Sequence, residues 1–274
     1  MGQTIDEHER GSPSVALEGV VAFYSGYHQR GVAPALHRGL ASPYLTLIFT
    51  IHEPLRVTRH VDPGRAPSTY DALLGGLHVT PAHIRHDGAQ SGIQVHLFPL
   101  GARRLLNMPA GEIAKVDLPA EVLLGSAVGE VGDKLRAARS WPNRFREVDS
   151  VLARLLQEAP PVAAEVAWAW ARLVDTGGRV AVHTLAGEVG WSERYLSTRL
   201  RKETGLTPKV AGRVIRFDRA RRMLQRTGGI NLAGVAHSCG YFDQAHMSRE
   251  FLQMAELPPK QWLDTEFGKV QYTV

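Results

Sequence analysis

The sequence predicts an α+β protein with an N-terminal β-barrel or β-sandwich, a helical linker and a C-terminal all-α domain. Three observations support this class. First, the 274 residues, 44% of them hydrophobic, exceed the usual size of one domain and can fill two cores. Second, short apolar runs separated by Gly and Pro fill the first 120 residues, as in β-rich domains. Third, helical periodicity replaces them after about residue 120.

Composition and chain punctuation set the expected boundaries. A proline pair cannot continue a helix, so we place a domain boundary at Pro160-Pro161. The expected segments are a flexible N-terminus at 1–14, a β-rich domain at 15–125, a helical linker at 126–160 and an all-α domain at 161–267.

The β-rich domain has five predicted strands, at 44–51, 54–61, 75–81, 82–86 and 92–100. The last is the clearest, because apolar residues alternate there with other side chains at a period of two. Its inward set is Ile93, Val95 and Leu97, and its outward set is Gln94, His96 and Phe98. A short helix is expected at 101–108.

Two helices are predicted around the proline pair. The segment 143–156 carries an apolar stripe at helical spacing, made of Phe145, Val148, Leu152, Leu155 and Leu156. The segment 162–176 carries a second stripe, and Gly177-Gly178 should end that helix.

The formal charge is unevenly distributed. Residues 181–265 contain 13 Lys and Arg against 8 Asp and Glu, whereas the rest of the chain contains 19 of each. The net charge of +5 therefore resides in the C-terminal third. A basic module attached to a neutral one is typical of nucleic-acid binders that have a separate second function.

This basic region repeats itself. The run "LAGEVGW" (185–191) is matched fifty positions later by "VAHSCGY" (235–241). In each copy a glycine can end one helix at positive φ, and Ser192 or Asp243 can cap the next. Buried anchors follow at Leu196 and Leu200 in the first copy, and at Met247 and Phe251 in the second. Each copy is thus a predicted helix-turn-helix, and a long helix at 208–224 joins them.

The outward residues of each second helix are candidate DNA contacts. Arg can bind guanine, Gln can bind adenine, and Ala or Thr methyl groups suit thymine. The predicted contact set is Ser192, Glu193, Arg194, Ser197, Thr198, Arg201, Gln244, Ala245, His246, Ser248 and Arg249. The connecting helix should bury Val210, Val214, Phe217, Ala220 and Leu224. Several of its arginines are expected to pair with Asp218, Glu203 and Glu188.

The doubled unit resembles the DNA-binding domain of the AraC/XylS family of bacterial transcription regulators. The resemblance covers roughly residues 165–265 and rests on "GWSERYLSTRLRKETGLTPKV", "VAHSCGYFDQAHMSREF" and "LPPKQW". Two departures are His237-Ser238-Cys239, where the family has small apolar residues, and Leu200, where it has phenylalanine. The resemblance implies double-stranded DNA as a partner, and RNA polymerase as a further one.

The same resemblance implies that 15–125 is a cupin-like domain that senses an effector, dimerises, or does both. The segment 126–160 would then also be a dimerisation segment in a homodimer. If the strands enclose an effector pocket, its candidate residues are Tyr44, Leu47, Phe49, His78 and His96. These residues would equally serve as plain core of the domain.

The sequence carries no recognisable enzyme motif. It lacks a nucleophile elbow, a phosphate loop and a dinucleotide fingerprint, so no cofactor and no catalytic residue are expected. The histidines lack cupin metal-ligand spacing, and His83 and His86 should point to opposite faces of a strand. The single cysteine and the absence of a signal-like or membrane-spanning run favour the cytoplasm. The alternative hypothesis is a cupin-type enzyme or small-molecule carrier with a helical partner domain.

Overall fold

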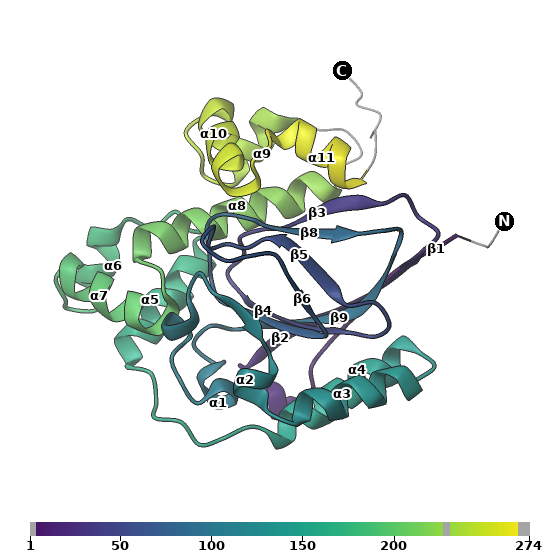
Figure 1. The fold of residues 1–274 in the computed structure, drawn as a ribbon. Helices are drawn as coiled ribbons and strands as arrows, with labels where there is room; N and C mark the ends of the chain where they lie inside the picture. The colour runs from purple at the N-terminus through teal and green to yellow at the C-terminus, as the bar shows by residue number, and fades with distance from the viewer. Residues whose placement is uncertain (1–3, 227–230, 268–274) are drawn as a thin grey trace. The chain divides into compact units, whose positions relative to one another are not determined.

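The computed structural model describes residues 4–226 and 231–267 (Figure 1). The chain divides into two compact units. The β-unit comprises 1–38, 44–77 and 82–161, and the helical unit comprises 39–43, 78–81 and 162–274. Within the described ranges, the helices are too short or too polar for any of them to cross a membrane. Sheets in one unit and helices in the other confirm the α+β class.

The β-unit contains two separate sheets that form a sandwich, not one closed barrel. The order of the larger sheet is β1 (Ile5–Gly11), β2 (Val21–Arg30), β9 (Ala89–Leu97), β4 (Leu45–Thr50), β7 (Ala72–Gly75) and β10 (Asp117–Pro119). The order of the smaller sheet is β3 (Ala35–Gly39), β8 (Ala82–His86), β5 (Leu55–Arg59) and β6 (Ser68–Tyr70). Strand β9 pairs antiparallel with both β2 and β4, so it lies at the centre of the larger sheet.

The predicted alternation in β9 is confirmed. Ile93, Val95 and Leu97 are fully buried, whereas Gln94 and His96 are half-buried. Because the side chains of a strand alternate between the two faces of its sheet, the two sets line opposite faces of the larger sheet.

Two predicted segments are wrong. Residues 5–11 of the expected flexible N-terminus form β1, which pairs with β2 along its whole length. This strand carries charged side chains and lies at the edge of the sheet, so it lacks the apolar alternation that marks strands. The strand expected at 75–81 is not found there. The observed strand, β7, lies just before it and has Gly75 as its last residue. Gly76 then passes so close to the chain that an added Cβ would lie 1.8 Å from the carbonyl oxygen of Ile113.

The β-unit also contains several helices, most of which come after β9 in the sequence. They are η1 (Val15–Leu17), α1 (Arg103–Leu106), η2 (Ala110–Ile113), α2 (Glu121–Leu124), α3 (Ala127–Ala137) and α4 (Trp141–Arg154). Helix α4 packs on the larger sheet, where the Phe145 ring stacks on Tyr24 at 5.8 Å between centroids. The Tyr24 hydroxyl also donates a 2.9 Å hydrogen bond to Asp149. The segment expected to be a linker is therefore helical and packs as part of the β-unit.

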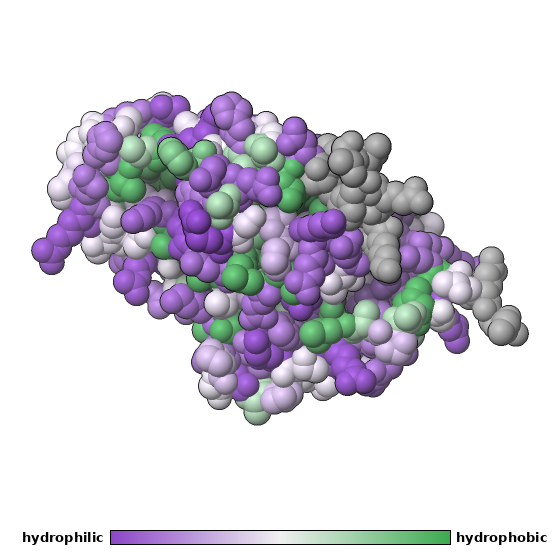
Figure 2. Space-filling view, turned by 90° about the horizontal axis from the view of Figure 1, so that it is seen from above, coloured by the Kyte–Doolittle hydropathy of each residue, from purple (hydrophilic) through white to green (hydrophobic). Residues whose placement is uncertain are grey.

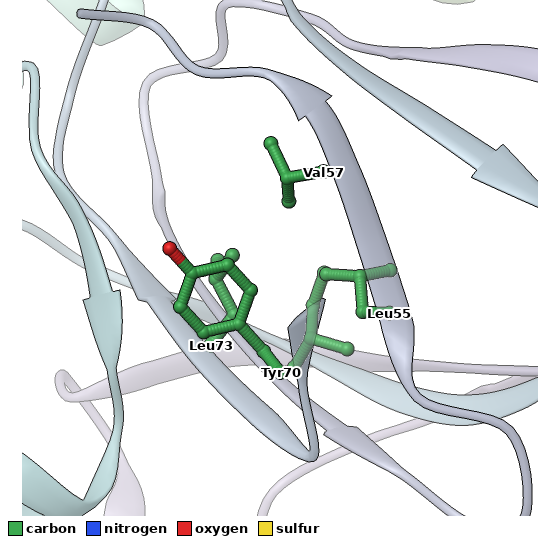
Figure 3. Packing of buried hydrophobic residues seen from close by; sticks show 5 residues of the cluster. Leu55, Val57, Tyr70 and Leu73 are labelled. Atoms are coloured by element: carbon green, nitrogen blue, oxygen red, sulfur yellow. The ribbon is translucent and has the colours of Figure 1, made fainter. Parts of the chain in front are cut away.

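The other face of the larger sheet packs against the smaller sheet. Figure 3 shows Leu55 and Val57 of β5 with Tyr70 of β6 and Leu73 of β7 in the packing of this cluster. The cluster consists of Ile48, Leu55, Val57, Tyr70 and Leu73, with Ile84 packed against it. This apolar cluster is the core of the sandwich.

The helical unit contains seven helices in its described residues. They are α5 (Ala164–Asp175), α6 (Val182–Glu188), α7 (Glu193–Thr204), α8 (Pro208–Arg226), α9 (Leu232–Ser238), α10 (Gln244–Ala255) and α11 (Pro259–Phe267). Its core contains an aromatic group in which Phe251 lies 4.8 Å from Phe217 and 5.9 Å from Trp262, measured between ring centroids. Helix α8 runs through this core and supports both helix pairs (Figure 1).

Candidate nucleic-acid interface

The first helix pair, α6 and α7, is joined by a tight turn whose hydrogen bonds explain its sequence. The Gly190 amide donates to the carbonyl of Gly187, and the Trp191 amide donates to the carbonyl of Ala186. These two bonds form a Schellman motif, which requires positive φ at the residue after the helix. Gly190 meets this requirement with φ of +70°. The predicted role of this glycine is confirmed.

The second pair, α9 and α10, uses the same turn. The Gly240 amide donates to the carbonyl of His237, and the Tyr241 amide donates to the carbonyl of Ala236. Gly240 has φ of +79°. The repeated glycine and aromatic residue of the sequence therefore correspond to a repeated backbone geometry.

Both second helices begin at the predicted cap residues. The Ser192 hydroxyl accepts the Tyr195 amide at 3.2 Å, and the Asp243 carboxylate accepts the His246 amide at 2.6 Å. Each cap satisfies one of the amides that lack a partner within the first turn of a helix. The start of each helix is thereby fixed, along with the side chains that follow it.

The four predicted anchors are buried and the outward residues are accessible. Leu196, Leu200, Met247 and Phe251 are fully buried. Eight of the predicted contact residues are exposed, namely Ser192, Glu193, Arg194, Thr198, Arg201, Gln244, Ala245 and Arg249. Ser197 and Ser248 are half-buried. The structure thus gives α7 and α10 each a polar outer face.

His246 is half-buried, and its ring also contacts residues of its own helix pair. Its ring lies edge-on to the buried Tyr241 at 5.4 Å between centroids, and its Nε2 lies 3.9 Å from the Glu250 carboxylate. These contacts give His246 a structural role at the start of α10, and its predicted role as a DNA contact stays a prediction.

Helix α8 uses several of its arginines within the domain. Arg221 and Arg222 both pair with Asp218, which is buried, as the sequence predicts for that carboxylate. Glu188 pairs instead with Arg172 of α5, which donates two hydrogen bonds to it. The predicted buried stripe is confirmed at Val214, Phe217, Ala220 and Leu224, while Val210 is half-buried.

Sequence reasoning missed Glu250, the buried carboxylate of α10. Its Oε1 accepts a 2.7 Å hydrogen bond from Arg213 of α8, and Arg216 lies 4.0 Å away. Burial, and then the charge of Glu250, raise the pKa of the neighbouring Tyr241 hydroxyl. The acidic residue inside an otherwise apolar stripe of α10 was the available signal. Glu250 thus connects α10 to α8.

Cys239 lies at the C-terminal end of α9 and is fully buried. Burial raises the pKa of this thiol above its ordinary value. Because the thiolate is the reactive form, the thiol is a poor nucleophile at neutral pH. The observed environment fits the predicted core role of this residue.

Four of the five residues proposed for an effector pocket lie in the β-unit, and these four do not share one face of its larger sheet. Tyr44 and His96 lie near each other, with ring centroids 6.1 Å apart, and His96 stacks on Phe23 at 3.9 Å. Leu47 pairs with Val95 in the sheet register, so Leu47 and Phe49 lie on the opposite face from His96. His78 lies between β7 and β8, outside the strands. The sequence did not show which residues of β4 share a face with His96, and an effector role for any of the five stays a prediction.

A small cavity of about 100 Å³ lies elsewhere in the β-unit. Its lining includes Tyr27, Thr50, Glu53, His86 and Gln90. Burial, and then the charge of Glu53, raise the pKa of the Tyr27 hydroxyl, which therefore stays protonated. Burial, and then the charge of His37, lower the pKa of His86, although Asp87 opposes this shift. Both groups are thus neutral hydrogen-bonding groups at pH 7.

Metal-binding geometry is not found in the described ranges, where no three His, Cys, Asp or Glu side chains converge to hold an ion. His83 is half-buried and His86 is buried, in keeping with positions of opposite parity on β8. The Nε2 of His83 lies 2.7 Å from the guanidinium of Arg59.

The arrangement of the helical unit defines its class. Two helix-turn-helix pairs, each with buried anchors beneath a polar outer face, are joined by one long helix. This is a double helix-turn-helix domain, built from a motif that many DNA-binding proteins use. Comparison with known proteins agrees. Residues 185–265 match the family model of the helix-turn-helix domain. The HTH-type transcriptional activator RhaS of Pectobacterium atrosepticum is 31% identical over 85 residues, which span 31% of this chain and 30% of that protein.

Solved structures resemble the whole chain. ToxT from Vibrio cholerae, crystallised with an unsaturated fatty acid bound, has a TM-score of 0.54 at 10% identity, covering 95% of this chain and 99% of that one. A further ToxT structure from Vibrio cholerae has a TM-score of 0.53 at 12% identity, covering 89% and 98%. Residues 185–265 therefore match the helix-turn-helix domain family, and the chain as a whole has a fold similar to that of ToxT.

Proposed function

We propose that this chain is a sequence-specific DNA-binding transcription regulator of the AraC type. The observation that carries the proposal is the pair of capped helices, α7 and α10, which present exposed polar side chains from two equivalent turns of one domain. The positive charge of the chain is concentrated in the same region, where it favours approach to a polyanion. A cytoplasmic, non-enzymatic role follows from this function.

The geometry suggests how the helices would read DNA. In helix-turn-helix proteins the first residues of the second helix contact base edges in the major groove. We propose that Arg194, Thr198 and Arg201 of α7 do so in one segment, and Gln244, Ala245 and Arg249 of α10 in the next. Helix α8 has 19 residues and is about 28 Å long at about 1.5 Å per residue. Successive major grooves lie about 34 Å apart, so one molecule would cover an asymmetric site of about two turns.

The direct test is selection of bound duplexes from a random pool by the full chain, followed by titration at several salt concentrations. The selected sites should share an asymmetric motif extending over about two turns. The logarithm of the association constant should fall steeply with the logarithm of salt concentration, because phosphate contacts release counterions. A slope near zero and no shared motif would contradict the proposal and favour the alternative of an enzyme or small-molecule carrier.

Arg249→Ala should weaken binding to the selected site by about 1–3 kcal/mol and relax the preference at one base pair. Arg249 is exposed on α10, whereas its neighbours Met247 and Glu250 are buried. The measurement is competition binding against the site and its single-base variants. Arg30→Ala is the matched control, because Arg30 is exposed in β2 and its loss changes the net charge equally. Equal losses on selected and random DNA would show that Arg249 contacts only phosphate.

We further propose that the β-unit binds an effector that sets DNA binding. ToxT is described with a fatty acid bound, so a chain of this fold can hold a small molecule. The small cavity beside Tyr27 has polar groups such as Glu53 and His86 and apolar walls at Leu55 and Ile84, which together suit a small ligand with polar and apolar parts. Contacts with RNA polymerase and with a second copy of the chain belong to the same proposal, in keeping with the family resemblance.

A further inference from the structure

Phe242 is the most exposed large hydrophobic side chain in the described part of the sequence, with 93% of its surface accessible. It immediately precedes Asp243, the cap residue of α10. Single exposed aliphatic residues are common on protein surfaces, but a whole aromatic ring left in water loses a large hydrophobic contribution. Its position at the start of a recognition helix suggests a use for it.

The backbone on both sides of Phe242 is fixed. Tyr241 is buried, and its amide closes the turn after α9 by bonding to the carbonyl of Ala236. The Asp243 carboxylate caps α10 through the amide of His246. The Phe242 amide itself points to Nδ1 of His246 at 3.5 Å. Because these contacts hold residues 241–243, the Phe242 ring is held out from the domain.

Comparison of the two helix pairs shows that Phe242 is an additional residue. In the first pair Trp191 is followed directly by the cap, Ser192. In the second pair Phe242 stands between the equivalent Tyr241 and the cap, Asp243. The glycine, the aromatic residue and the cap have the same roles in both turns. The turn is therefore complete without Phe242, whose side chain adds only to the outer surface.

We propose that Phe242 is a specificity-determining residue that contacts a thymine methyl group in the major groove segment read by α10. This inference rests on the proposed function, because it assumes that α10 enters the groove. The thymine methyl is the apolar group that the major groove presents, and aromatic and small apolar side chains recognise it by contact. Gln244 and Ala245, the first residues of α10, are exposed beside Phe242. Together they would form a surface suited to A·T pairs.

The test replaces thymine by deoxyuridine, one position at a time, in the site selected by the full-length protein. Deoxyuridine lacks only the methyl group, so the substitution isolates this contact. Loss of one buried methyl corresponds to about a fourfold loss of affinity, and the wild-type protein should show it at one or two positions of the half-site bound by α10. Phe242→Ser should bind the thymine site about tenfold more weakly. It should no longer distinguish thymine from deoxyuridine at those positions.

Two controls separate this contact from other effects. Leu252→Ser changes another exposed apolar residue of α10, which is 55% accessible and lies about two turns further along the helix, and it should leave affinity unchanged. Thermal unfolding of Phe242→Ser should match that of the wild type, since the ring is exposed. Phe242→Leu should retain part of the discrimination because it retains apolar surface.

The outcomes distinguish this inference from the proposed function. If the wild-type chain selects no DNA motif, the proposed function itself fails. If it selects a motif but Phe242→Ser binds as the wild type does, or still distinguishes thymine from deoxyuridine, the methyl contact is wrong and the regulator remains. The inference would also be overturned if Phe242→Ser lost the same affinity for every duplex and neither protein distinguished thymine from deoxyuridine. The ring would then contact the DNA backbone and no thymine methyl group.

Discussion

Gly178→Ala should destabilise the helical unit by about 3 kcal/mol, from left-handed backbone strain and overpacking together. Gly178 lies after the end of α5 with φ of +75°, where its amide donates to the carbonyl of Leu173 in a Schellman motif. An added Cβ would lie 2.2 Å from the carbonyl oxygen of Gly212, a backbone atom of α8. Neither helix can move away cheaply, because Arg216 of α8 also donates a 2.5 Å hydrogen bond to the Gly178 carbonyl.

Urea unfolding followed by tryptophan fluorescence measures this effect, because four of the five tryptophans lie in the helical unit. Gly187→Ala is the matched control. Gly187 is a residue of α6 at which an added Cβ meets nothing within 4 Å, and alanine there should be neutral or stabilise by about 0.5–1 kcal/mol. The interpretation is wrong if the free energy of unfolding of Gly178→Ala lies within about 1 kcal/mol of the wild-type value.

Glu250→Ala should cost about 2–3 kcal/mol of stability and also weaken specific DNA binding. Glu250 is 6% exposed and accepts the hydrogen bond of Arg213, whose second nitrogen donates to Gln253 at 2.5 Å. Removing the carboxylate leaves the Arg213 and Arg216 guanidinium groups without their anionic partner. Because this contact joins α10 to α8, its loss should also let the recognition helix shift.

A double-mutant cycle with Arg213→Ala separates the pair from other consequences of the change. Glu250→Gln keeps an acceptor of the same shape and should lose less stability than Glu250→Ala. The coupling energy between positions 213 and 250 should reach about 1 kcal/mol, measured by urea unfolding at pH 7. Additive effects would show that the two side chains contribute independently, and would remove the argument that Glu250 positions α10.

The β-unit shows which strands a sequence pattern can orient and which it cannot. The alternation of Ile93, Val95 and Leu97 was sufficient to predict β9, because both faces of that strand have a distinct environment. Strand β4 is nearly all apolar, with Leu47, Ile48 and Phe49 all buried. Such a run has no period from which its inward face could be read. The effector-pocket prediction therefore combined residues from both faces of the sheet, and only the register with β9 assigned those faces.

The sequence by itself determined the doubled helix-turn-helix, because every signal for it is local. A glycine at positive φ, a cap residue and anchors at i and i+4 each act within one or two helical turns. The tertiary structure alone decided the side-chain environments that depart from the repeated pattern. His246 turns toward Tyr241, Glu250 is buried against Arg213, and Phe242 is left in water. The physical reason is that burial depends on partners distant in sequence, which no local pattern specifies.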